Sequence, residues 1–91
     1  MATLTDIGTL IVSNPEIRGG RPRLSGTGVT IHRVVGWYKL GLAPEEIADR
    51  LGHLSLAQVH AALAYYHANC QEIEADLAAE ERETDALAAS A

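Results

Sequence analysis

The chain has 91 residues, 47% hydrophobic and 21% charged, which is long enough for one small globular domain and too apolar for a disordered chain. It contains no Phe, so its core must come mainly from Leu, Ile, Val and Ala, and little volume remains to enclose a substrate. The formal charge of −5 hides two blocks: residues 17–44 contain five Arg or Lys and no acid, and residues 71–91 contain seven acids and one Arg.

Separated charge blocks of this kind indicate two surfaces for two different partners, or two solvated faces. The single Cys70 excludes an intramolecular disulfide and favours a reducing compartment. The N-terminus has no signal-peptide pattern, and no apolar run reaches the ~18–20 residues of a membrane span. We therefore expect a soluble cytoplasmic protein that does not contact a membrane.

The first third of the chain favours short extended segments. Residues 9–12 form a β-branched run that ends at a turn signal, residues 13–15. Four glycines and one proline in residues 18–28 exclude a helix interior and predict a loop or hairpin. Residues 29–31 are expected to form a second extended piece. Two such strands are marginal alone, and they need a helix or a second subunit to cover them.

From His32 onward the apolar spacing is helical. A first helix is expected to end at Gly41, and a second to begin at Pro44, with acids in its first turn, and to end at Gly52. A capping box at Ser55-x-x-Gln58 opens a third helix, which no residue before the C-terminus is predicted to break.

Residues 44–59 have the spacing of a helix-turn-helix. If this unit reads DNA, the base-contacting candidates are Ser55, Gln58 and His60, because residues 55–70 contain no Arg or Lys. Phosphate contacts would then come from the glycine-rich loop, as a clamp or a minor-groove arm, through Arg18, Arg21 and Arg23. Alternatively, the helix-turn-helix is only a scaffold, and the arginines are a solubilising rim around a dimer-forming hairpin.

The third helix carries a heptad-like series at spacings of three and four: Leu56, Val59, Leu63, Tyr66, Cys70, Ile73 and Leu77. Over residues 56–66, packing on the preceding helices explains this series. Beyond Cys70 few residues remain to cover it, which predicts a homodimer or a higher oligomer.

Residues 67–91 are interpreted as an acidic helical extension of a first domain, residues 1–66. A parallel pair of such helices would set acids against acids, so we expect the extension to lie on a basic, partly apolar surface of another protein. The residues expected to bind this partner are Ile73, Glu74, Leu77, Glu80, Glu81 and Leu87. The alternative is a frayed, solvated helix end.

No catalytic or cofactor motif is present in the sequence. The glycines do not form a phosphate-cradling pattern with a strand and a helix around it. His67 and Cys70 are an i, i+3 pair without the further ligands that a metal site needs, and Cys70 has no triad partner. We therefore expect no enzyme, no metal and no cofactor.

The stretch from Ile11 to Tyr66 resembles the bacterial domain-of-unknown-function family 433, whose members are often described as antitoxin-like halves of toxin–antitoxin pairs. The resemblance rests on residues 14–17, 20–22, 26–27, 41–47 and 54–65. It implies a mainly α, homeodomain-like three-helix domain with a short N-terminal β element, followed here by a long C-terminal helix.

The same resemblance implies a protein partner, a PIN-like ribonuclease toxin, and an antitoxin that neutralises it and binds operator duplex DNA as an autorepressor. In one respect the sequence departs from the family: Gly28 follows Thr27 where members usually carry a basic residue. The alternative function is a protein-binding or oligomerisation module that does not bind DNA.

Overall fold

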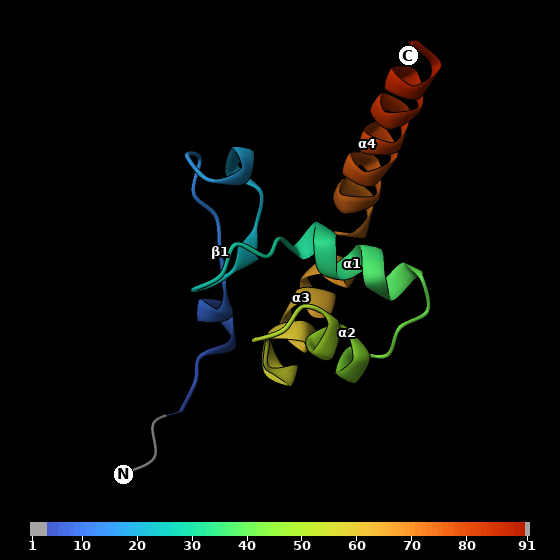
Figure 1. Cartoon of the computed structure of the whole chain (residues 1–91). Helices are drawn as coiled ribbons and strands as arrows, with labels where there is room; N and C mark the ends of the chain where they lie inside the picture. Colours follow the sequence, from blue (N-terminus) through green and yellow to red (C-terminus); the bar gives the residue numbers. More distant parts are fainter. Residues whose placement is uncertain (1–3, 91) are drawn as a thin grey trace.

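The computed structural model describes residues 4–90, without the side chains of Arg18 and Ser90, and measures 59 × 29 × 23 Å (Figure 1). The element order is η1 (Ile7–Leu10), β1 (Ile11–Val12), η2 (Arg18–Gly20), β2 (Arg23–Leu24), α1 (Ile31–Lys39), α2 (Pro44–Arg50), α3 (Leu56–Ala68) and α4 (Cys70–Ser90). The predicted class is confirmed: the chain is mainly helical, with a short two-stranded sheet before the helices and a long helix at the C-terminus.

The β element is an antiparallel pair in which Ile11 lies opposite Leu24. The expectation of a strand at residues 29–31 is wrong, since Thr30 makes only an isolated bridge to Arg23 and Ile31 begins α1. The reason is a helix cap: the Thr30 hydroxyl accepts a hydrogen bond from the Arg33 backbone N–H at 3.2 Å. Leu24 is fully buried, so the helices cover the small sheet.

The helices α1 and α2 and the start of α3 lie where local signals predict. Pro44 opens α2, and Ser55 and Gln58 open α3 with a reciprocal capping box. Gly52 has a φ of 68°, a left-handed conformation suited to glycine, and it turns the chain between α2 and α3. Their inward faces form the core: Ile31, Val34, Val35, Ile47, Val59, Ala62, Leu63 and Tyr66.

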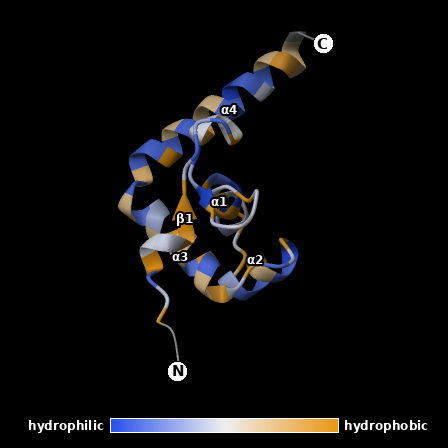
Figure 2. Cartoon of the chain, turned by 90° about the vertical axis from the view of Figure 1, so that its left-hand side faces the viewer, coloured by the Kyte–Doolittle hydropathy of each residue, from blue (hydrophilic) through white to orange (hydrophobic). Residues whose placement is uncertain are grey.

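The predicted uninterrupted third helix is wrong, because it breaks at Asn69, with φ −131° and ψ 37°. The Asn69 side-chain amide donates to the Tyr65 carbonyl at 3.1 Å, a local side-chain bond of the kind that competes with regular helix geometry. α4 starts one residue later and leaves α3 at an angle (Figure 2).

The first half of α4, residues 70–80, packs on the chain's own core. Ile73 is only 2% exposed, and Cys70 and Leu77 are partly buried against the same cluster. The heptad-like series beyond Cys70 is therefore covered within one chain, and it does not require a second copy. The expected oligomer stays a prediction.

Candidate functional site

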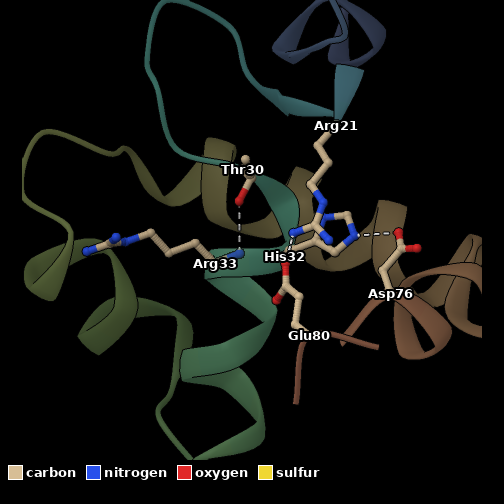
Figure 3. Close-up of polar contacts among 6 residues, drawn as sticks. All are labelled: Arg21, Thr30, His32, Arg33, Asp76 and Glu80. Carbon is tan, nitrogen blue, oxygen red and sulfur yellow. Dashed lines mark hydrogen bonds and ion pairs between the residues drawn. The ribbon is translucent and has the colours of Figure 1, made fainter. Parts of the chain in front are cut away.

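The basic block and the first half of α4 face each other across one interface. Arg21 pairs with Glu80, His32 Nε2 lies 2.9 Å from Asp76 Oδ2, and Lys39 Nζ lies 2.7 Å from Glu74 Oε2 (Figure 3 shows the first two pairs). The interpretation of the two blocks as surfaces for different partners is therefore wrong for these residues, because they bind each other.

Helical spacing explains how one helix makes all three contacts. Ile73 and Leu77, four residues apart, lie on one face of α4 and meet the core. Glu74 falls on one side of this apolar stripe, and Asp76 and Glu80 fall on the other. The first half of α4 is thus an apolar stripe with acidic flanks, seated on an apolar surface that has basic flanks.

Tyr66, Glu74 and Lys39 form a linked polar group at one flank. The hydrogen bond from Lys39 is the main cause that lowers the pKa of Glu74, and the hydrogen bond from Tyr66 adds to it. Conversely, the bond to Glu74 is the main cause that raises the pKa of the Tyr66 phenol, followed by Cys70 and burial. The group therefore holds a carboxylate and a neutral phenol side by side.

His32 forms the centre of the other flank. Its side chain is 4% exposed, and its Nδ1 atom has no hydrogen-bond partner among the described residues. Figure 3 shows Arg21 reaching toward Glu80 beside the His32 ring, while the Arg33 side chain extends away from this cluster. Together with Gly28, Thr30 and Leu77, these residues line a pocket of about 230 Å³.

The residues predicted to bind DNA have other roles in the fold or lie apart from it. Arg21 is paired with Glu80, and Arg23 is half-buried in β2 with a buried Nη1 that has no partner among residues 4–90. The Ser55 hydroxyl and the Gln58 side chain bond to each other's backbone N–H at 3.1 and 2.8 Å. His60 is exposed on α3, and the Arg18 side chain lies outside the described part.

The residues predicted to bind a protein partner divide into two groups. Ile73 and Leu77 pack on the chain's own core, and Glu74 and Glu80 pair with its own cations. Glu81 and Leu87 instead lie on the second half of α4, residues 81–90, of which residues 81–89 are exposed, with Leu87 72% exposed.

Sequence reasoning missed His32, Lys39 and Asp76 as members of this interface. One local signal could have found His32: it lies three residues before Val35, on the apolar face of α1. Nothing local pairs Lys39 with Glu74, because 35 residues separate them.

Among residues 4–90, no helix is both long and apolar enough to cross a bilayer. No three His, Cys, Asp or Glu side chains gather there as a metal site would require.

Comparisons with known proteins identify the family. A search among curated proteins finds no match. The fold is similar to the crystal structure, at 2.00 Å resolution, of a DUF433 member protein from Anabaena variabilis ATCC 29413, with a TM-score of 0.71 and 24% identity over 77% of this chain and 69% of that one. The family model described as "Protein of unknown function (DUF433)" matches residues 11–66, well over half of the sequence. The chain therefore belongs to the DUF433 family.

Proposed function

We propose that this chain is an antitoxin that binds and neutralises a protein toxin, a PIN-like ribonuclease, through the second half of α4. One observation carries the proposal: α4 continues beyond the folded domain as an exposed, acidic helix (Figure 1). Residues 81–89 are all exposed, and they carry Glu81, Glu83 and Asp85 against the single cation Arg82.

The second half of α4 keeps the acidic character of the first half and carries one exposed leucine. Helical spacing places Leu87 near the line of Ile73 and Leu77, with the polar residues Glu80 and Thr84 between them along the helix. Acids again flank this line, with Glu83 on one side and Glu81 and Asp85 on the other. The first half, which combines such acids with two apolar residues, is seated on an apolar surface with basic flanks, so we expect the second half to fit a basic, partly apolar partner surface.

A nuclease supplies such a surface. The rim of a ribonuclease active site must attract phosphates, so it is basic, and a row of carboxylates can occupy it. The resemblance described above points to the same class of partner. Binding there would block the RNA substrate and neutralise the enzyme.

Direct base reading by α3 is not part of the proposal. Ser55 and Gln58 are engaged in the capping box, and α3 contains no Arg or Lys. Arg50, the cation on α2, lies over the Trp37 ring with its guanidinium carbon 5.7 Å from the ring centroid. The helix-turn-helix therefore acts as a scaffold that positions α4.

The test is co-expression with the product of the adjacent gene, with growth and RNA cleavage as readouts. The variant Glu81→Gln/Glu83→Gln/Asp85→Asn removes three carboxylates from the second half of α4. Its matched control, Glu45→Gln/Asp49→Asn/Glu72→Gln, removes three exposed carboxylates elsewhere. Circular dichroism checks that both variants keep the fold.

We expect the first variant to lose neutralisation and the control to keep it, because only the first removes the carboxylates that face the partner. Equal neutralisation by the two variants would contradict the proposal. So would an adjacent gene whose product is not a ribonuclease and does not bind the chain.

A further inference from the structure

We infer that the pocket between Arg21, His32 and the start of α1 is a phosphate-binding site that Glu80 closes in the free chain. This inference goes beyond the proposed function and does not depend on a toxin. The ligand class is a phosphate group, either free in solution or within a nucleic-acid backbone.

One side of the pocket is positively charged. Arg21 comes from the segment before β2, and Thr30, His32 and Arg33 come from the first turn of α1 or its cap. The first turn of α1 contains no acid, and a helix N-terminus has a partial positive charge. Residues 17–44 contain no acid at all, so this side of the pocket has only positive charge.

The carboxylate at the pocket comes from a different element, α4. Glu80 is the one carboxylate among the lining residues that the structure describes. Its side chain is 47% exposed and pairs with Arg21, which is 31% exposed. A half-exposed ion pair of this kind is weak, so an incoming anion can replace the carboxylate on Arg21.

The His32 side chain has a buried nitrogen without a hydrogen-bond partner among the described residues. His32 lines the pocket and is 4% exposed, and this nitrogen is its Nδ1. Buried polar atoms nearly always have a partner, and His32, whose Nε2 is bonded to Asp76, leaves its Nδ1 without one within residues 4–90, at the wall of a cationic pocket, which points to a ligand. A phosphate can accept hydrogen bonds from Arg21 and from a protonated Nδ1 together. Arg33 also lines the pocket, and its side chain extends away from the Arg21–His32 cluster in Figure 3.

The experiment uses the full chain and follows the His32 ring by NMR during titration with inorganic phosphate and, separately, with a short DNA duplex. Glu80→Gln removes the closing carboxylate. Glu81→Gln is its matched control, because it removes the same charge from the next residue, which does not line the pocket. A third variant, Arg21→Gln/Glu80→Gln, also removes the cation.

We expect Glu80→Gln to bind phosphate about threefold tighter or more than both the wild type and Glu81→Gln, the scale of one half-exposed ion pair. The Arg21→Gln/Glu80→Gln variant should lose this gain. A response to inorganic phosphate identifies a site for the free anion, and a response to the duplex alone identifies a site for the nucleic-acid backbone. Equal affinity of the Glu80→Gln and Glu81→Gln variants would overturn the inference. So would a His32 ring that responds to neither ligand in Glu80→Gln.

Discussion

The Tyr66 hydroxyl donates a hydrogen bond to Glu74, and this contact joins α3 to α4 across the helix break at Asn69. The same carboxylate accepts a hydrogen bond from Lys39 of α1, with Nζ 2.7 Å from Oε2. One side chain of α4 thus binds two other helices. Together with the burial of Ile73 in the core, it holds residues 70–80 in the folded unit.

The lowered pKa of Glu74 makes this contact sensitive to acid. A carboxyl group whose pKa is lower in the folded state contributes stability above its ordinary value, here 4.5, and this stability is lost as the pH falls through the lowered value. We expect Glu74→Gln to unfold more easily than the wild type at neutral pH and to show a flatter pH dependence below 4.5. Urea unfolding across that range measures both effects. Glu72→Gln is the control, and an equally flat curve for it would contradict the assignment.

The raised pKa of Tyr66 predicts that the folded state loses stability at high pH, whereas the lowered pKa of Glu74 predicts a loss at low pH. A group whose pKa is higher in the folded state contributes stability below its ordinary value, here 10.0, and this stability is lost as the pH rises through the raised value. Absorbance of tyrosinate should show a late ionisation step in the native protein that Tyr66→Phe removes. In urea, the three tyrosines should ionise without this late step. A late step that survives in Tyr66→Phe would show that another group causes it.

The first half of α4 is docked on the core and the second half is exposed. Shortening one apolar side chain in each half should therefore change the unfolding free energy by unequal amounts. Ile73→Ala should cost about 2–5 kcal/mol of unfolding free energy, because Ile73 is buried in the core. Leu87→Ala should change it by about 0.5 kcal/mol or less, because Leu87 lies at an exposed position. Chemical denaturation measures both values. Similar losses for the two variants would contradict the division.

The cap at the start of α3 gives Ser55 a structural role that a stability measurement can test. Ser55→Ala should cost about 1 kcal/mol of stability, because it removes the acceptor for the Gln58 N–H. Ser55→Asp should restore most of this loss, since aspartate caps equally well. Thermal unfolding of both variants is the measurement. If Ser55→Ala is as stable as the wild type, the cap contributes nothing.

Local signals in the sequence predicted the helix-turn-helix well. Pro44, Gly52 and the Ser55–Gln58 capping box each act within a few residues, so their effect can be read from neighbouring positions. The break at Asn69 had only a weak local signal, the asparagine itself, because neither glycine nor proline is present there. The packing of Ile73 on the core favours the new helix direction.

The contacts of α4 could not be predicted from one sequence. The pairs Arg21–Glu80 and His32–Asp76 join residues that are 59 and 44 positions apart. Their charges were visible as two blocks, but charge alone does not tell whether two blocks meet each other or meet other molecules. Only the fold brings the acidic flank onto the basic face, and it leaves residues 81–90 as the part that extends beyond the domain.

Amide hydrogen exchange along α4, with and without the ribonuclease toxin proposed above as its partner, tests the division of this helix most directly. In the free chain we expect slow exchange over residues 73–80 and fast exchange over residues 82–90, because only the first group is held by the core. In the complex, residues 82–90 should become protected while residues 73–80 change little. Exchange over residues 82–90 that the ribonuclease leaves unchanged would contradict the assignment of this segment to partner binding.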